Sequence, residues 1–467
     1  MLPAVIHADG AFGSKWRTDV HMYIPGVTST NPMTLEVEFK GTRKFLPVDS
    51  STFIYEDFLQ FMTPGQDQGT VLLRGNSPNI PQLWTRTYNV SATGVGTFGQ
   101  LIPAVLLTGQ QYASFDAPVL NIGGLRQSVE FRTNVGFANP NGTAITLTAT
   151  IYEESFGLPI GSFTATLGAY ALDQRALTSW FPGLPTDIGG LSLRINNPSG
   201  LQVIGYASIT DNTSNDPVFV PAIPDGQIAD DDYVIQIVPG VGHVGAWRSD
   251  LSVFNPDSSA VALDLVYYDT TGVEASRVTN LTLPSKGTVI IEDLLRSGVI
   301  TPVINTDSIG TLEVITKINK DLFPVVYART YNDQEAAGTF GQGIPAFASG
   351  RANVRVGHPA FVPGVRSDPS YYTNLGLNSL SATGTTEIRI SLLDPINGAV
   401  KALRTEFLGP KQSTIIPRVM SDYLFSLSDR GTIKVEVMSG GPVWAYASIV
   451  DKTTFDPEYV PASPAIN

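Results

Sequence analysis

The chain of 467 residues contains no cysteine and only four histidines. Without cysteine there can be no disulfide, no thiolate nucleophile and no cysteine-ligated zinc. The histidines His7, His21, His243 and His358 show no ligand spacing such as i, i+4. We therefore predict neither a histidine metal site nor a Ser-His-Asp triad.

Charge is also scarce. Charged residues make up 15% of the chain, and 29 Lys and Arg against 42 Asp and Glu give a net charge of −13 that is spread thinly. A thin negative charge disfavours nucleic acid and anionic membranes as partners. No stretch approaches the roughly 20 uninterrupted apolar residues of a membrane helix, so no membrane insertion is predicted.

Catalytic motifs are missing as well: there is no Gly-x-Ser-x-Gly elbow, no His-Glu-x-x-His and no Walker loop. Two Gly-x-Gly-x-x-Gly matches, Gly94–Gly99 and Gly240–Gly245, are not followed by the helix that a dinucleotide site needs. We interpret their members as turn glycines. The sequence thus predicts a protein that is not an enzyme, with no catalytic residue and no bound cofactor apart from the calcium considered below.

A repeated phrase organises the chain. Leu, Ile or Val followed by Pro-Ala occurs five times, at intervals of about 100 to 125 residues, and a fixed period of this kind predicts a repeat architecture. The phrases are Leu2-Pro3-Ala4, Ile102-Pro103-Ala104, Val220-Pro221-Ala222, Ile344-Pro345-Ala346 and Val460-Pro461-Ala462. We predict four domains, at residues 1–105, 106–224, 225–347 and 348–467.

Longer matches pair these predicted domains. The first and third share Trp16-Arg17-Thr18-Asp19 with Trp247-Arg248-Ser249-Asp250, and both end in a Gly-Thr-Phe-Gly-Gln phrase. The second and fourth share a closing Tyr-Ala-Ser-Ile phrase with an Asp and an Asp-Pro after it. One domain duplicated to a pair, and the pair duplicated again, explains both matches.

The third predicted domain shows the expected fold. Short segments rich in Val, Leu, Ile, Thr and Tyr are bounded by turn-forming residues and indicate strands. They are 247–255, 261–268, 276–283, 311–317 and 324–331. One or two helical turns are expected at Ile291–Gly298, with a counterpart at Glu56–Phe61. The prediction is an all-β chain of four tandem immunoglobulin-like antiparallel β-sandwich domains, arranged as a duplicated pair.

The motifs together resemble a known kind of sequence. The Trp-Arg-Thr/Ser-Asp opening, the Asn255-Pro256 turn, a Glu-Asp-Leu crossover and the Tyr-Ala-Ser-Ile-Val-Asp close are similar to repeats of uncharacterised, predicted secreted bacterial proteins. The resemblance covers nearly the whole chain. It implies extracellular β-sandwich modules and no known activity. The second and fourth repeats depart from it by lacking the opening Trp.

Met1 stands directly before a repeat phrase, and we expect that a leader peptide has been removed.

One local charge cluster suggests an ion site. Asp230, Asp231 and Asp232 lie at the boundary between the second and third repeats. Clustered carboxylates on a loop suit calcium, which takes 6 to 8 oxygen ligands. A solvated acidic linker is the simpler interpretation, and calcium remains the alternative.

The Trp-Arg phrases admit two readings. Strand alternation places Trp16 and Thr18 on one face and Arg17 and Asp19 on the other, so Trp16 and its equivalent Trp247 are expected in the core and Arg17 beside a carboxylate. The late-strand arginines, Arg86 and Arg329, are interpreted as structural. The alternative is an exposed surface of Trp, Tyr and Arg that contacts a sugar or a protein.

Two functions remain open. The first is an extracellular or cell-surface structural or adhesive repeat protein, whose partners are other copies of itself or extracellular polymers. One version of this function is a subunit of a surface filament or other polymer. In its sharper form, Leu2, Pro3, Ala4 and Val5 dock end-to-end on the carboxyl end of another copy. The second is a carbohydrate-binding or accessory module of a secreted enzyme system, which predicts a row of solvent-facing Tyr or Trp on one sheet.

Overall fold

The structure is a computed structural model, which describes all residues except 11–12, 76–80, 92–93, 95, 108–115, 155, 226–232, 318–321, 427 and 465–467. The chain divides into two compact units. Unit 1 comprises 1–104, 270–273 and 351–467, and unit 2 comprises 105–269 and 274–350. The two ends of the chain therefore belong to the same unit. We name the strand-bearing stretches segment I (1–104), segment II (116–224), segment III (233–348) and segment IV (351–467).

Segment I forms one antiparallel sheet. In the residues described there, the strands are β1 (Leu2–Asp9), β2 (Lys15–Tyr23), β3 (Met33–Phe39), β4 (Thr42–Val48), β5 (Thr52–Tyr55), β6 (Asp67–Gly75), β7 (Gln82–Val90) and β8 (Thr97–Pro103), and the helix is α1 (Phe58–Met62). The strand order is β4-β3-β6-β1-β2-β7-β8, with β5 paired to β2. Strand β1 pairs with both β6 and β2, so it joins two halves that are separate sheets in the other segments.

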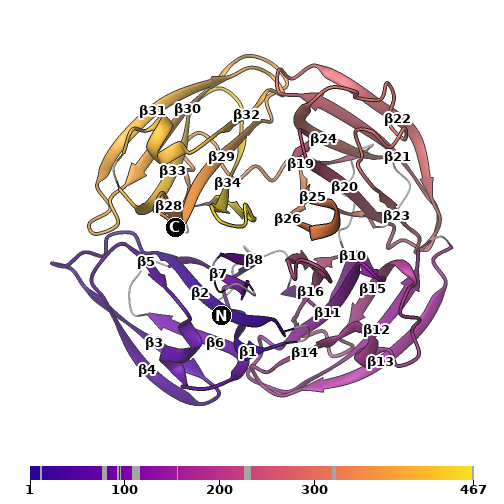
Figure 1. The fold of residues 1–467 in the computed structure, drawn as a ribbon, viewed down its shortest axis with the longest axis horizontal. Helices are drawn as coiled ribbons and strands as arrows, with labels where there is room; N and C mark the ends of the chain where they lie inside the picture. The colour runs from indigo at the N-terminus through magenta and orange to yellow at the C-terminus, as the bar shows by residue number, and fades with distance from the viewer. Residues whose placement is uncertain are drawn as a thin grey trace. The chain divides into compact units, whose positions relative to one another are not determined.

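Segment IV, which completes unit 1, has two antiparallel sheets (Figure 1). Its described strands are β28 (Ala360–Arg366), β29 (Tyr371–Ser379), β30 (Thr386–Leu393), β31 (Val400–Leu408), β32 (Ser413–Ile416), β33 (Arg430–Ser439), β34 (Val443–Asp451), β35 (Pro457–Pro461) and β36 (Ser463–Pro464). A π-helical turn spans Val419–Tyr423. The sheet orders are β31-β30-β33-β28-β36 and β32-β29-β34-β35, and the core draws buried residues from both.

Segments II and III, which belong to unit 2 apart from 270–273, repeat this plan. Segment II has β9 (Asp116–Ala117), β10 (Val119–Gln127), β11 (Phe131–Ala138), β12 (Ile145–Glu153), β13 (Pro159–Leu167), β14 (Leu172–Ala176), α2 (Leu177–Trp180), β15 (Gly189–Asn196), β16 (Val203–Asp211), β17 (Pro217–Pro221) and β18 (Ile223–Pro224). Its sheets are ordered β13-β12-β15-β10-β18 and β14-β11-β16-β17, with β9 on β16.

Segment III shows the same two orders, β22-β21-β24-β19-β27 and β23-β20-β25-β26. Its elements within the described residues are β19 (Tyr233–His243), β20 (Trp247–Phe254), β21 (Val261–Asp269), β22 (Glu274–Leu283), β23 (Thr288–Ile291), β24 (Ser308–Lys317), β25 (Val325–Asp333), the 3-10 helix Glu335–Ala337, β26 (Thr339–Pro345) and β27 (Phe347–Ala348). The prediction of an all-β chain of antiparallel sheets is confirmed. No helix among the described residues is long and apolar enough to cross a membrane.

Side-chain alternation explains the strands. In β3, Leu35, Val37 and Phe39 are fully buried, whereas the intervening Glu36 and Glu38 face outward and pair with Arg74 of β6. A period of two places the apolar set on one face. Burying each such apolar side chain contributes about 1.5 to 3 kcal/mol, so the pattern fixes which face meets the core.

A glycine bulge recurs at one place in three segments. The register of β28 shifts between Pro363 and Val365, at Gly364, whose φ is +71°. Strand β10 has a corresponding bulge with Gly124 (φ +70°), and β19 has one with Gly240 (φ +68°). Glycine adopts this left-handed conformation without steric cost, and the bulge bends the strand. Gly240 therefore lies in a strand bulge, and its interpretation as a turn glycine is wrong.

The expected helix in the third repeat is also absent. Residues 292–296 form consecutive turns, whereas the counterpart in segment I does contain α1. Asp293 has φ +42° and Gly298 has φ +80°, so only four residues lie between two left-handed positions. Left-handed residues on both sides limit any right-handed helix there to about one turn.

Candidate functional site

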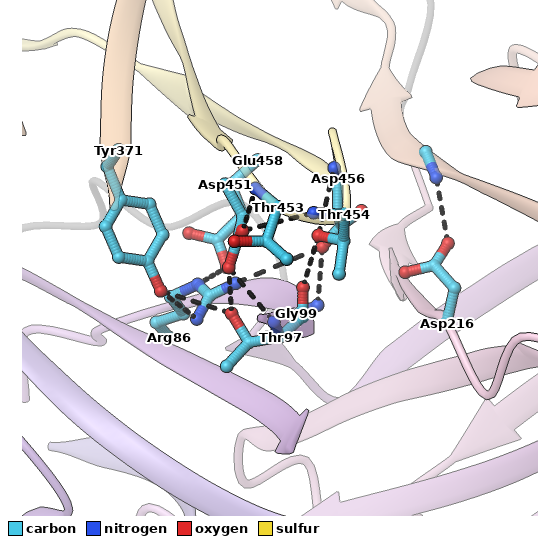
Figure 2. A network of polar contacts seen from close by, with 11 residues as sticks. Arg86, Thr97, Gly99, Asp216, Tyr371, Asp451, Thr453, Thr454, Asp456 and Glu458 are labelled. Atoms are coloured by element: carbon cyan, nitrogen blue, oxygen red, sulfur yellow. Dashed lines mark hydrogen bonds and ion pairs between the residues drawn. The ribbon is translucent and has the colours of Figure 1, made fainter. Parts of the chain in front are cut away.

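Segments I and IV meet within unit 1 along β8 and β35, and we call this contact junction A. Figure 2 shows its polar network. The guanidinium of Arg86, on β7, is 3% exposed and forms an ion pair with Glu458 of β35, which is 2% exposed. Two charges removed from water are stable only when good geometry and further hydrogen bonds compensate their lost hydration.

Two aspartates of segment IV bind main-chain N–H groups across junction A. Asp456 Oδ2 accepts a hydrogen bond from the Gly99 N–H, with an N···O distance of 2.7 Å. Asp451 Oδ2 accepts from both the N–H and the hydroxyl of Thr97, at 3.0 and 2.8 Å. The hydroxyl of Thr454 donates to the Thr97 carbonyl at 2.8 Å. Hydrogen bonds to ionised groups are stronger than neutral ones, so this set fixes β8 against segment IV.

Asp451 also builds the turn that follows β34. Its Oδ1 accepts hydrogen bonds from the N–H groups of Thr453 and Thr454, at 2.8 and 3.2 Å. Phe455 in the same turn has φ +60°. An aspartate that bonds the N–H two residues ahead favours a turn. The same carboxylate therefore closes its own turn and binds segment I.

Burial governs the electrostatics of the ion pair. It raises the pKa of Glu458 to about 7, although the nearby Arg86 opposes this shift. Burial alone would lower the pKa of Arg86, but Glu458, Tyr371 and Asp456 together raise it above its usual range. Arg86 Nη1 also donates to the Tyr371 hydroxyl at 3.2 Å. Arg86 therefore stays charged near neutral pH, where Glu458 titrates.

An aromatic pair lies beside this network. His21 of β2 stacks on Trp84 of β7 with ring centroids 3.8 Å apart, and Trp84 Nε1 donates to the Pro363 carbonyl of segment IV at 3.1 Å. A Cβ on Gly364 would come within 2.4 Å of His21 Nδ1, so the bulge makes room for the imidazole. Within the described residues, neither ring nitrogen of His21 has a well-aligned hydrogen bond. Burial, with the positive charges of Arg366 and Arg86, lowers the pKa of His21 well below its usual value.

Unit 2 contains the same arrangement between segments II and III, which we call junction B. Asp216 Oδ2 accepts from the Gly341 N–H at 2.8 Å, a contact drawn beside Asp216 in Figure 2. Asp211 Oδ2 accepts from the N–H and hydroxyl of Thr339, at 2.9 and 2.8 Å. The Ser214 hydroxyl donates to the Thr339 carbonyl at 2.7 Å. Every main-chain contact described for Asp451 and Asp456 thus occurs twice in the chain.

Besides Thr454 in place of Ser214, the two junctions differ in several other side chains. Strand register makes Glu458 equivalent to Val218, and His21 equivalent to Ser252. By the same registers, Trp84 corresponds to Tyr327 and Tyr371 to Phe131. Arg329, which corresponds to Arg86, donates to the Thr339 hydroxyl at 2.7 Å. Junction A therefore holds a titratable Glu and His where junction B has Val and Ser.

A second duplicated site lies in segments I and III. His7 Nδ1 is 2.8 Å from Asp57 Oδ1, and His243 Nδ1 is 2.8 Å from Asp293 Oδ1. The partner arginine of each carboxylate, Arg17 or Arg248, is the second residue of a Trp-Arg phrase. The spacing of the four histidines does not indicate that His7 and His243 are equivalent. The available signal was that His7 and His243 each precede a Trp-Arg phrase, at distances that differ because the intervening loops differ in length.

The structure places the predicted docking residues in a sheet of their own chain. Leu2 pairs with Val71, and Val5 with Gly69, on strand β6. Leu2, Pro3, Ala4 and Val5 are all buried, the first and last fully. A direct end-to-end contact through these four residues stays a prediction, and it would require β1 to leave β6.

The two phrase tryptophans are half-buried. The Trp16 indole packs over Gly10, and Trp247 meets Phe340 edge-on with ring centroids 6.3 Å apart. Neither belongs to the fully buried core, which differs from the expectation that they fill it. Thr18 does point into the core, and Arg17 lies 3.6 Å from a carboxylate oxygen of Asp57, as expected for this strand.

The predicted calcium ligands Asp230, Asp231 and Asp232 lie outside the described residues. Within the described part of the chain, no group of three or more His, Asp or Glu side chains could hold a metal ion. The calcium hypothesis for the three aspartates stays a prediction.

Exposed aromatic side chains are scattered. Of the tryptophans and tyrosines whose side chains are described, only Tyr170 is classed as exposed, at 36%. The other exposed aromatic residues in the described part of the chain are Phe45, Phe156, Phe407, Phe425 and Phe455. A carbohydrate-binding face needs rings aligned along one sheet, and these residues come from separate loops and strands.

Models of known protein families and the curated proteins were compared with the chain, and nothing matches.

Proposed function

We propose that this chain is a non-enzymatic, extracellular structural or adhesive repeat protein. In this proposal it consists of four immunoglobulin-like sandwiches, duplicated as a pair, as the repeat phrases and the repeated sheet orders of segments II, III and IV suggest. Its partners are other copies of itself or extracellular polymers.

The duplicated junction is the observation that carries the proposal. The buried charges described above, Arg86, Glu458 and Asp456, serve contacts between segments. An active site instead directs perturbed groups into a cleft that a substrate can reach. Junctions A and B use their polar groups to hold segments in a fixed register, as a structural or adhesive protein requires.

The carbohydrate-binding alternative has less support. It needs a row of exposed Tyr or Trp, and Tyr170 alone among the described residues of these two types is exposed. Stacking on sugar rings requires such accessible aromatic faces.

Two measurements test the proposal. Light scattering behind size exclusion, over a concentration series with calcium and with chelator, should show mass that grows with protein concentration. Antibody labelling of intact source cells should place the chain outside the membrane. A protein that stays monomeric at every concentration and is retained by an insoluble glycan would instead favour the alternative.

A further inference from the structure

Junctions A and B are equivalent in contacts but differ in how the chain connects them. Junction B joins segments II and III, which follow one another in the chain. Junction A joins segment I to segment IV, with residues 105–350 lying between them in sequence. The two halves of junction A are therefore linked only through a folded unit, and no short linker holds them together.

The two halves of junction A are also unlike each other. Apart from the Thr454 hydroxyl, which donates from segment IV, segment I supplies the donors described above: the N–H groups of Thr97 and Gly99 and the guanidinium of Arg86. Segment IV supplies the acceptors Asp451 and Asp456 and the carboxylate of Glu458. Each chain thus carries one donor face and one complementary acceptor face. A contact between unlike faces can be satisfied within one chain or between successive copies.

Opening of junction A is energetically unfavourable, so an open chain tends to close it again. Trp84 of segment I belongs to the hydrophobic core of segment IV, and Tyr23 stacks on Phe361 with centroids 5.2 Å apart. Opening exposes these rings and leaves Arg86 without its carboxylates. The surface that satisfies all of these groups is the acceptor face of segment IV, whether from the same chain or from another.

We propose that junction A exchanges between copies, so that segment I of one chain binds segment IV of a second copy through the same contacts. This inference rests on the proposed structural function and names its assembly contact. Closure within one chain prevails in dilute solution because the local concentration of the tethered face is high, and exchange between copies takes over as protein concentration rises. The product is a chain of copies linked donor face to acceptor face.

The absence of cysteine allows a direct test. Thr52 of segment I and Thr432 of segment IV are buried, and their hydroxyl oxygens lie 2.9 Å apart across junction A. Cysteines at such facing positions are close enough for a disulfide. Thr52→Cys and Thr432→Cys are made as separate full-length proteins, mixed at rising concentration, and oxidised. We expect a disulfide-linked heterodimer whose yield rises with concentration.

Matched controls make the result specific. Thr42→Cys, on the exposed start of β4, replaces Thr52→Cys in a parallel mixture and should give no heterodimer above background. Cysteine is close to threonine in size, so we expect each single variant to fold. Circular dichroism melts of the variants check this. The double variant T52C/T432C should form the disulfide within one chain.

Light scattering of that locked double variant separates the inference from the proposed function. Under the inference it stays monomeric where the unlocked chain grows in mass. Equal growth of the locked and unlocked chains would overturn the exchange and leave assembly by another surface. A mixture of single variants that never yields the heterodimer would also overturn the exchange.

Discussion

Glu458 is the residue that most distinguishes the two junctions, since Val218 occupies the same place in junction B. The Glu458 side chain is 2% exposed, and this burial disfavours the ionised form of its carboxyl group. Because its folded pKa of about 7 exceeds the usual 4.5, its contribution to stability is fully present below pH 4.5 and is lost as the pH rises through 7.

The Glu458→Gln variant should remove this pH dependence. Between pH 5 and 8 we expect the free energy of unfolding of the wild type to fall by about 2 to 3 kcal/mol relative to the variant. The check is urea denaturation of both proteins at the two pH values. The pH-independent effect of leaving Arg86 without an anion cancels in this comparison. A constant difference between the proteins would show that Glu458 does not titrate in this range.

His21 gives the free energy of unfolding a pH dependence of the opposite sign. Its folded pKa lies well below 6.5, so its contribution is fully present above pH 6.5 and is lost as the pH falls toward the folded pKa. The variant His21→Ser copies Ser252 of junction B. We expect the wild type to lose about 1.4 kcal/mol relative to this variant for each pH unit below 6.5. Thermal melts at pH 7.5, 6 and 5 measure the difference, and parallel Tm curves for the two proteins would contradict the prediction.

At the level of elements, the turns after β34 and β16 hold the junctions. Asp451 and Asp211 each accept hydrogen bonds from their own turn and from a threonine across the junction. Removal of a buried charged acceptor leaves several donors without partners.

We expect Asp451→Ala and Asp211→Ala each to lower the free energy of unfolding by about 3 kcal/mol. Denaturation midpoints of the two variants measure this. Thr213→Ala, in the same turn as Asp211, keeps the carboxylate and should cost less than about 1 kcal/mol. A cost for Asp451→Ala no greater than for Thr213→Ala would mean that the carboxylate contributes little.

Strands could be predicted from the sequence, but the junctions could not. The five strands expected in the third repeat match β20, β21, β22, β24 and β25 with small shifts at their ends. Local period and turn residues determine such elements. Strands β19, β23 and β26 were not predicted. In β19, Pro239 and Gly240 interrupt the pattern at a bulge. The Arg86–Glu458 pair joins positions far apart in one sequence, where no local signal connects them.

For the molecule as a whole, the division into units has a consequence for stability. Unit 2 is nearly continuous in the chain, interrupted only at 270–273. Both halves of junction B lie within it, whereas segment IV has its junction partner at the opposite end of the sequence.

Residues 105–350 expressed alone should therefore fold, with a cooperative thermal transition and dispersed amide signals in an NMR spectrum. Residues 351–467 expressed alone should be less stable, since Trp84 is missing from the core of segment IV. Addition of separately produced 1–104 should raise the Tm of that fragment. An isolated 351–467 that melts at the temperature of the full chain would show that junction A adds little to stability.

The donors at both junctions have a consequence for sequence change. Gly99 and Gly341 bind their aspartates through the peptide nitrogen, which every residue type except proline possesses. Mutation of neighbouring side chains cannot delete such a donor. The acceptor is a side chain, so replacement of the aspartate still removes the interaction. The neighbouring positions, in contrast, differ between the junctions as Trp or Tyr, Glu or Val and His or Ser while the main-chain donor stays the same.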